Sequence, residues 1–216
     1  LPLGLFFVVA QPAWMGHDES VHFPRAWQIA GGDLTQSTTA DGLADNRAYA
    51  ILEDSSGFLW FATQAGVSRY DGEKFSNFTT ADGLVHDDVN GVIEASDGRI
   101  WMATDGGVSC YDGASFTNYT VEKNGIPSAH VHGIAQSRDG DIWAATSGGI
   151  WRLGGGEYKT YTKADGLPND QVQRVFEDSM GYLWFSTWGG LCRYDGEVFQ
   201  TLTVEDGLAG SVVMSI

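Results

Sequence analysis

The five histidines are the residues of this sequence best suited to metal binding or proton transfer. They are His17, His22, His86, His130 and His132. His130 and His132 are two positions apart at the start of an expected strand, so both imidazoles can lie on the same side of it. Together with His86 they could hold a metal ion, but imidazoles that hydrogen-bond within a loop are the more common arrangement. The sequence shows no phosphate-binding loop, serine nucleophile elbow or calcium loop.

A second possible chemistry is ligand binding by one tryptophan and the polar residues around it. The flat indole ring of Trp188 could stack on a sugar ring, or it could fold back and cap the core of its own strands. The polar candidates for contacts with such a ligand are Asn169, Asp170, Gln171, Arg174, Asp87, His130, Asn46 and Arg47. Arg174 could contact an anion or a uronate, or it could pair with an acid such as Asp170 or Asp88.

These candidates belong to a sequence unit that recurs at steps of 41 or 42 residues. Its Asp-Gly-Leu start, or a close variant, falls at residues 41, 82, 124, 165 and 206. A tryptophan keeps the same spacing inside each complete unit, at Trp60, Trp101, Trp143 and Trp184. A fixed period near 40 residues is typical of repeat architectures. We expect the four tryptophans to be buried at equivalent positions between the units.

Each unit divides into four short strands separated by tight turns. In the fourth unit the expected strands are residues 172–176, 182–187, 191–194 and 198–203. Runs of β-branched and aromatic residues bounded by Gly, Asp and Ser predict strands, and Asp-Gly between two such runs predicts a hairpin. Four antiparallel strands per unit make one blade of a β-propeller. The predicted fold class is therefore all-β, with blades at residues 41–81, 82–123, 124–164 and 165–205.

The repeated pattern DGL-x5-V/I-x-E-D-S-x-G-x-LW-F-x-T-x-GG-L-x-RYDG resembles the two-component regulator propeller repeat. The resemblance extends from Asp41 onward. In that family such repeats come in sets of seven and build the extracytoplasmic sensor region of bacterial hybrid sensor kinases and of some diguanylate cyclase receptors. The resemblance therefore implies that further blades, an Ig-like domain, a transmembrane helix and signalling domains accompany these four units in a longer receptor. It also implies that the receptor is exported and could form a homodimer.

The two ends of the sequence indicate a part of a longer chain. Residues 1–10 are wholly apolar and are interpreted as the end of a secretion signal, the alternative being a buried strand. Residues 11–32 form a lead-in segment without periodicity. Residues 33–216 are assigned to the propeller, in which 34–39 align with an outermost strand and 206–216 begin a fifth blade. We therefore expect an open arc of four complete blades from a seven-bladed ring, with partial strands at both ends.

The sequence is strongly acidic, with 12 Lys and Arg against 28 Asp and Glu and a formal net charge of −16. This argues against nucleic acid or an anionic membrane as a partner, because phosphates are bound by Lys and Arg. Cys110 and Cys192 occupy different positions on strands two units apart, so we expect free thiols and no disulfide. We expect no cofactor.

Differences between the units indicate where function lies. The loops that precede each first strand and those that join second and third strands should share one rim, and these loops vary from unit to unit. Binding groups concentrate on loops held by a rigid scaffold, so this rim is the expected ligand face. We expect a non-enzymatic extracytoplasmic sensor of a small ligand, and the resemblance implies an oligosaccharide. The alternatives are an enzyme resembling the streptogramin lyases, which would need a His, a Glu and a metal, and a protein-binding propeller.

Overall fold

The computed structural model describes residues 28–29, 32–33 and 38–214, and most of these form four antiparallel sheets. Each sheet has four strands that follow one another in chain order. The first two sheets contain β3 (Ala48–Glu53), β4 (Leu59–Thr63), β5 (Gly66–Tyr70) and β6 (Phe75–Phe78), then β7 (Val89–Glu94), β8 (Ile100–Thr104), β9 (Gly107–Tyr111) and β10 (Phe116–Tyr119). The other two contain β11 (Val131–Gln136), β12 (Ile142–Thr146), β13 (Gly149–Gly154) and β14 (Glu157–Tyr161), then β15 (Val172–Glu177), β16 (Leu183–Thr187), β17 (Gly190–Tyr194) and β18 (Phe199–Leu202). The four strands expected in each unit are confirmed.

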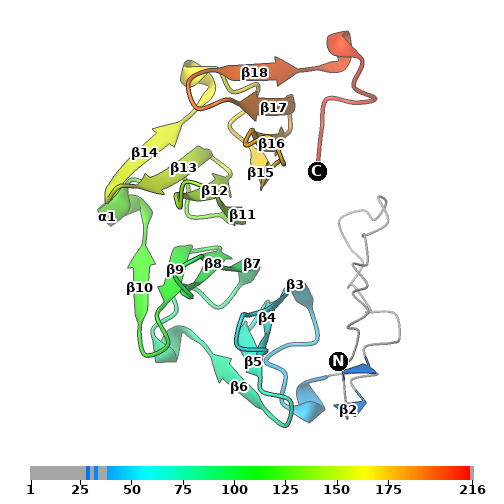
Figure 1. Cartoon of the computed structure of the whole chain (residues 1–216), viewed down its shortest axis with the longest axis vertical. Coiled ribbons are helices and arrows are strands. Elements are labelled where there is room, and N and C mark those ends of the chain that lie inside the picture. The colour runs from blue at the N-terminus through cyan, green and yellow to red at the C-terminus, as the bar shows by residue number, and fades with distance from the viewer. Residues whose placement is uncertain (1–27, 30–31, 34–37, 215–216) are drawn as a thin grey trace.

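The sheets are arranged as blades along an open arc (Figure 1). The first strand of each blade (β3, β7, β11, β15) lies on the inner side of the arc, and the fourth strand (β6, β10, β14, β18) lies on the outer side. Neighbouring inner strands approach closely: a Cβ added at Gly133 in β11 would lie 3.1 Å from the carbonyl oxygen of Gln173 in β15. The first and last sheets are not joined to each other. The structure confirms the expected β-propeller class and its open arrangement.

A short helical turn precedes each of the four blades, and a fifth follows the last one. The five turns are η1 (Thr39–Asp41), η2 (Thr80–Asp82), α1 (Val121–Asn124), η3 (Lys163–Asp165) and η4 (Val204–Asp206). In η2, Asp82 Oδ2 accepts a hydrogen bond from the backbone amide of Thr79 at 2.9 Å, while Thr79 Oγ1 accepts one from the amide of Ala81. Gly83 then adopts a φ of 108°, and Leu84 is buried. The repeated Asp-Gly-Leu is therefore a capped turn followed by a core residue.

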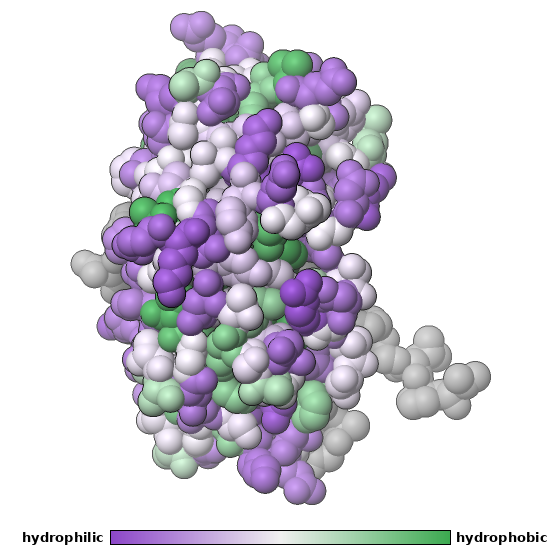
Figure 2. Space-filling view, turned by 90° about the vertical axis from the view of Figure 1, so that its left-hand side faces the viewer, coloured by the Kyte–Doolittle hydropathy of each residue, from purple (hydrophilic) through white to green (hydrophobic). Residues whose placement is uncertain are grey.

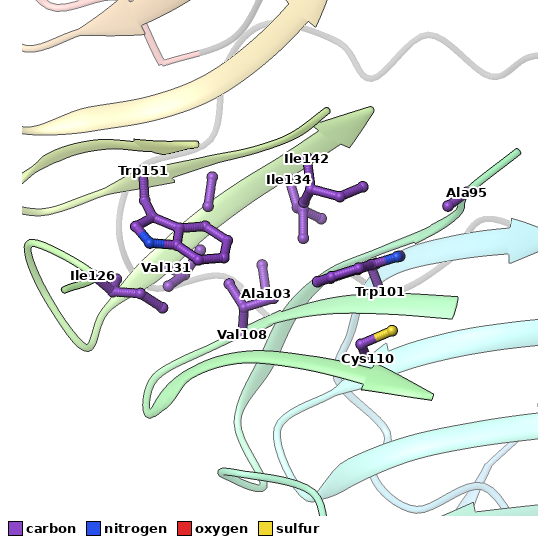
Figure 3. Close-up of a cluster of buried hydrophobic side chains, with 11 residues drawn as sticks. Ala95, Trp101, Ala103, Val108, Cys110, Ile126, Val131, Ile134, Ile142 and Trp151 are labelled. Carbon is purple, nitrogen blue, oxygen red and sulfur yellow. The ribbon is translucent and has the colours of Figure 1, made fainter. Parts of the chain in front are cut away.

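The core lies between neighbouring blades and is built around the tryptophans of the second strands. Trp60, Trp101 and Trp143 are each at most 2% exposed. Figure 3 shows side chains of the second and third blades facing each other: Trp101, Ala103, Val108 and Cys110 on one side and Val131, Ile134, Ile142 and Trp151 on the other. Trp184 has the equivalent position in the fourth blade but is only partly buried, because no complete blade follows it among the described residues. The predicted position is confirmed in all four blades and full burial in three.

The predictions for the ends of the chain fall largely outside the described residues. Residues 1–10 and 34–37 and most of 11–32 are not described, and β1 (Gln28–Ile29) pairs antiparallel with β2 (Gly32–Asp33). Residues 208–214, expected to open a fifth blade, do not form a strand. The backbone amide of Val213 nevertheless donates to the carbonyl oxygen of Thr187 in β16 at 2.9 Å. A strand needs a ladder partner in its own blade, and the described residues after η4 offer none.

The outer side of the arc is mainly polar. Figure 2 looks onto this side and shows hydrophilic side chains with small, separate apolar areas between them. None of the helical segments in the described part of the chain has the length and apolar character needed to cross a membrane.

Both cysteines are free thiols, as predicted, and both are buried. Cys110 lies in β9 and Cys192 in β17. Burial raises the pKa of each thiol to about 11, which keeps both groups protonated at neutral pH. They therefore act as small apolar core residues.

Candidate functional site

The rim that varies between the units is built from two loops per blade, joined by a backbone hydrogen bond. The residue after each second strand donates its amide to the carbonyl oxygen of the residue that precedes the first strand. The four bonds are Gln64 to Arg47 at 3.3 Å, Asp105 to Asp88 at 3.0 Å, Ser147 to His130 at 3.1 Å, and Trp188 to Gln171 at 3.1 Å. We call residues 45–47, 64, 86–88, 105, 128–130, 147, 169–171 and 188 the variable rim. The prediction that these two sets of loops share one rim is confirmed.

Every first strand begins with a β-bulge, a feature that the sequence pattern does not predict. The register between first and second strands shifts by one residue at Tyr49, Asn90, His132 and Gln173. A bulge leaves its extra residue out of the ladder and re-aims the side chain, and bulges are common beside functional sites. The sequence does show that these equivalent positions differ in chemistry, because they carry a phenol, two amides and an imidazole.

In the first three blades the turn residue after the second strand is held by another side chain of the same blade. Asn90 Nδ2 donates to Asp105 Oδ1 at 2.8 Å. His132 Nε2 and Ser147 Oγ form a hydrogen bond of 2.7 Å. In the first blade, Arg47 Nη1 donates to Gln64 Oε1 at 3.2 Å. These three turn residues therefore already have partners.

The three histidines in the described part of the chain make separate contacts. His86 Nδ1 accepts a hydrogen bond from the backbone amide of Asp88 at 3.0 Å, and His130 Nδ1 lies 3.4 Å from Asp105 Oδ2. Burial lowers the pKa of His132, and the nearby guanidinium of Arg174 lowers it further, so this imidazole is neutral at pH 7. The residues that the structure describes contain no group of three His, Cys, Asp or Glu side chains arranged to hold a metal ion. Hydrogen bonding within one loop, the more common arrangement, is therefore found for His86, whereas His132 is bonded to the turn after the second strand and His130 lies near an acid of the second blade.

The second blade makes one part of the rim acidic. Burial raises the pKa of the Asp88 carboxyl, and the neighbouring Asp105 carboxylate raises it further. Asp88 Oδ1 is buried and has no hydrogen-bond partner among the described residues. Burial and the charge of Asp88 also raise the pKa of the Tyr49 phenol. This part of the rim disfavours a negatively charged ligand.

The fourth blade presents side chains without partners in the described part of the chain. Trp188 is 45% exposed, although the same position in the other blades carries hydrogen-bonded polar side chains. Gln173 is only 9% exposed, and its side-chain amide has no hydrogen bond to the described residues. Arg174 Nη1 donates to the carbonyl oxygens of His132 at 2.6 Å and Gln173 at 2.9 Å. The exposed indole and these neighbours form the strongest candidate for a ligand contact.

Two of the predicted site residues connect the fourth blade to the third. Gln171 Nε2 donates to the carbonyl oxygen of Ser147 at 3.0 Å, and Arg174 reaches the third blade through His132. The expected ion pair of Arg174 with Asp170 or Asp88 is not formed. The guanidinium extends over the inner strands and meets backbone carbonyl groups first.

Other predicted site residues are occupied by the loop itself. Asp87 Oδ1 accepts from the amide of Thr80 at 2.7 Å, and Asp170 Oδ1 accepts from the amide of Lys163 at 2.7 Å. Asn46 Oδ1 has the same role on Thr39 at 2.9 Å, and Asn169 Oδ1 accepts from the amide of Gln171 at 2.8 Å. These oxygens satisfy backbone amides at the start of the helical turns or within the loop. They support the rim and are poorly placed to be ligand groups.

Comparison with known families agrees with the repeat units. The family model of the two component regulator propeller matches four stretches, residues 42–65, 83–106, 125–148 and 166–189. Each stretch contains the rim loop, the bulged first strand and the second strand of one blade. No curated protein is similar enough in sequence to count as a relative.

Solved propeller structures have the same fold. The extracellular domain of a hybrid two-component system from B. thetaiotaomicron superposes with a TM-score of 0.70 and 25% identity, over 77% of this chain and 24% of that one. A second such domain from the same organism superposes with a TM-score of 0.63 and 22% identity, over 74% of this chain and 25% of that one. Virginiamycin B lyase from Staphylococcus aureus superposes with a TM-score of 0.62 and 17% identity, over 77% of this chain and 58% of that one. This similarity shows a shared fold only. The chain spans about a quarter of the length of the two extracellular domains. With four matched repeats, each folded as a blade, the chain belongs to the two-component regulator propeller family.

Proposed function

We propose that this chain is the non-enzymatic ligand-sensing propeller of an exported bacterial signalling receptor, and that its ligand contacts the variable rim at the fourth blade. The similarity to extracellular domains of two-component systems supports the sensor role. The main evidence for the position of the site is Trp188, which is 45% exposed. The equivalent positions in the other three blades carry Gln, Asp and Ser. A bare indole at a loop forgoes burial worth about 1.5–3 kcal/mol, which a bound ligand can restore.

An oligosaccharide matches the chemistry of this part of the rim. The face of an indole stacks on the apolar face of a sugar ring, and hydroxyl groups bond to amides. Gln173, which is 9% exposed, supplies such an amide. Gln171, two residues earlier in the chain, is already oriented by its hydrogen bond to Ser147. A ligand that hydrogen-bonds to Gln173 and covers Trp188 therefore gains a hydrogen bond and buried apolar area.

The same residues offer a route by which ligand binding reaches the rest of the propeller. Gln171 and Arg174 hydrogen-bond to backbone carbonyls of the third blade, so a ligand that engages them changes the contacts between two blades. In this proposal the change passes to output domains elsewhere in the receptor. The family resemblance implies that these domains are of the kinase type and that the signal is transmitted through a receptor dimer. A ligand shifts the equilibrium between two conformations of a receptor only when its affinities for the two conformations differ.

The test is calorimetric titration of the chain with a panel of oligosaccharides. For a ligand that binds, Trp188→Ala is expected to weaken affinity by about tenfold, the loss of one stacking contact with its buried area. Gln64→Ala, at the same turn position in the first blade, is the matched control and should leave affinity unchanged. Affinity that is lost in Gln64→Ala but kept in Trp188→Ala would place the site on another blade. Absence of binding to the whole panel would contradict the oligosaccharide proposal.

An enzyme of the lyase type is less well supported. The likeness to virginiamycin B lyase is at 17% identity and concerns the fold. Among the described rim histidines, His86 accepts a hydrogen bond from the Asp88 amide, His132 is bonded to Ser147, and His130 Nδ1 lies 3.4 Å from a carboxylate oxygen of Asp105. We therefore infer binding without turnover, which the same titration tests, because a substrate that is consumed gives continuing heat after saturation.

A further inference from the structure

Arg174 differs from the other arginines in the described part of the chain. Three of these pair with carboxylates: Arg99 with Asp97 at 2.6 Å, Arg138 with Glu177 at 3.2 Å and Arg152 with Asp141 at 2.5 Å. Three others contact side-chain amides or aromatic rings, namely Arg47, Arg69 and Arg193. Arg174 contacts only backbone carbonyl oxygens among the described residues, in a chain with 28 acidic residues. Its positive charge is therefore not neutralised by a described carboxylate.

The guanidinium of Arg174 is held in a fixed orientation. Both hydrogen bonds of Nη1 are used, one on the carbonyl of His132 in the third blade and one on that of Gln173 in the fourth. The side chain passes over Gly133, where an added Cβ would lie 3.5 Å from Arg174 Cδ. The equivalent positions of Arg174 in the other blades are Ala50, Gly91 and Gly133, so the other three inner strands carry no charge there.

The part of the guanidinium that remains free has the geometry of a carboxylate clamp. With Nη1 occupied, the Nε–H and one Nη2–H form the parallel edge of the planar group. Neither nitrogen has a partner among the described residues. Two parallel N–H donors match the two oxygens of a carboxylate, and such bidentate pairs are among the strongest hydrogen bonds in proteins.

The surroundings of this edge favour an anion with polar groups attached. Gln173, the residue before Arg174 in the chain, is 9% exposed, and its side-chain amide has no hydrogen bond to a described residue. His132 is bonded to Ser147, and burial and the charge of Arg174 lower its pKa, so it is neutral at pH 7. The acids Asp88 and Asp105 are concentrated on the second blade, so repulsion directs an anion away from them toward the fourth.

We propose that Arg174 forms a carboxylate-binding subsite at the inner edge of the variable rim, so that the ligand of the fourth blade is an acidic sugar. The carboxylate binds the Nε–Nη2 edge, and a neighbouring hydroxyl group bonds to Gln173. The sugar component rests on the proposed function, whereas the carboxylate clamp rests on Arg174 alone. A lysine cannot replace this clamp, because its ammonium group is a point charge without a planar fork.

The test compares two ligands that differ only in the carboxylate. An oligogalacturonate and its carboxyl-reduced form are titrated by calorimetry into the chain and into Arg174→Gln, Arg174→Lys and Arg47→Gln. The chain is expected to bind the acidic form at least about tenfold more tightly than the reduced form, and this preference should weaken as salt rises. Arg174→Gln should abolish the preference without weakening the reduced form. Arg174→Lys should keep only part of it, and Arg47→Gln, the control at the other rim arginine, should keep all of it.

The outcomes separate this subsite from the proposed function. Equal binding of both forms by the chain, or an acidic preference that survives Arg174→Gln, would overturn the subsite, while sensitivity to Trp188→Ala would still support a sugar site. No binding of either form would overturn both proposals for this ligand class. Circular dichroism of each variant shows whether the blades remain folded, and retained affinity of Arg174→Gln for the reduced form is a second check.

Discussion

Asp54 accepts a hydrogen bond from the indole Nε1 of Trp60 at 2.7 Å, and the same carboxylate caps two backbone amides of its own turn. The fourth blade repeats this arrangement between Asp178 and its tryptophan at 2.8 Å. In the second blade Ala95 stands at the position of Asp54, and the buried indole N–H of Trp101 has no partner among the described residues. The indole N–H of the second-strand tryptophan therefore has an acceptor in the first and fourth blades and no described acceptor in the second and third.

Replacing Ala95 by Asp is therefore expected to stabilise the chain. The new carboxylate would supply the missing acceptor, and a hydrogen bond to a charged group contributes about 1.5–3 kcal/mol net. The midpoint of urea unfolding at pH 7 measures the change. The control is Asp54→Ala, which should lower the midpoint by a larger amount, because it removes the acceptor of two backbone amides as well as that of the indole. A lower midpoint in Ala95→Asp would mean that the second blade has no room for the carboxylate.

The turns between first and second strands lie at the end of each blade opposite the variable rim, and side chains at the ends of the first strands connect these turns in neighbouring blades. The Glu94 carboxylate accepts from the Ser55 amide at 2.7 Å and from the Ser55 hydroxyl at 2.6 Å in the preceding blade. Gln136 makes the corresponding contact to the Ser96 amide at 2.7 Å. Both the Glu94 carboxylate and the Gln136 amide oxygen accept a hydrogen bond from a backbone amide of the preceding blade. This backbone hydrogen bond is therefore the feature that the two contacts share.

Substitutions of Glu94 test this contact between blades. Glu94→Ala should lower the free energy of unfolding by about 1–2 kcal/mol, because it leaves the Ser55 amide without its partner. Glu94→Gln should cost less, since it preserves the acceptor. Glu53→Ala is the matched control: Glu53 ends the first strand of the first blade, is exposed, and should change stability by less than about 0.5 kcal/mol. Equal effects of Glu94→Ala and Glu53→Ala in chemical denaturation would contradict the proposed contact.

The scaffold tryptophans should differ in their contributions to stability according to the blades around them. Trp101→Ala is expected to cost about 3–5 kcal/mol, because its ring is 1% exposed between two blades. Trp184→Ala should cost clearly less, since this ring is only partly buried. Urea unfolding of the two variants at the same protein concentration measures the difference. An equal cost would show that Trp184 is covered in solution, as it would be by association of chains.

The stability of the chain should depend on pH through Asp88. The folded-state pKa of this carboxyl is raised above its usual value by burial and by Asp105, so its ionised form destabilises the fold at neutral pH. This penalty is present above the folded-state pKa and is lost as pH falls from there toward about 3.9, the pKa of an unperturbed aspartate.

Asp88→Asn should therefore raise the melting temperature at pH 7, and the gain should shrink on acidification toward pH 4. The neighbouring variant Asp87→Asn is the control. It weakens the acceptor for the Thr80 amide and should lower the melting temperature at pH 7. A gain in Asp88→Asn that is constant from pH 7 to pH 4 would show that the carboxylate charge is not the cause.

Many features of the fold follow from the sequence because each repeated element is local. Asp-Gly-Leu specifies a capped turn, a glycine with positive φ and a buried leucine within a short stretch of chain. Tight turns then define four strands, and the repeat places the tryptophans at equivalent positions. The free cysteines also follow from strand position alone. None of these inferences requires knowledge of a contact between distant residues.

The candidate site could be predicted only in outline. Trp188 stood out because the other units carry polar residues at its position, and this difference is visible in the sequence. The roles of Asp87 and Asp170 are not visible, since each oxygen is bound by an amide seven residues upstream once the loop has folded. The bulge residues were missed because a bulge is a property of the register between two strands.

The sequence by itself determined a row of four-stranded blades, their buried tryptophans and the rim on which the units differ. Only the tertiary structure decided which rim groups have partners. Asn90 and His132 hydrogen-bond to the turn residues of their own blades, and Asn90 also donates to the Val131 carbonyl of the next blade, while Gln173 has no described partner. Arg174 is held by carbonyls of two blades, which leaves one edge of its guanidinium free of described partners. Hydrogen bonds between residues in neighbouring units depend on how one blade packs against the next, and that packing is set by the whole arc.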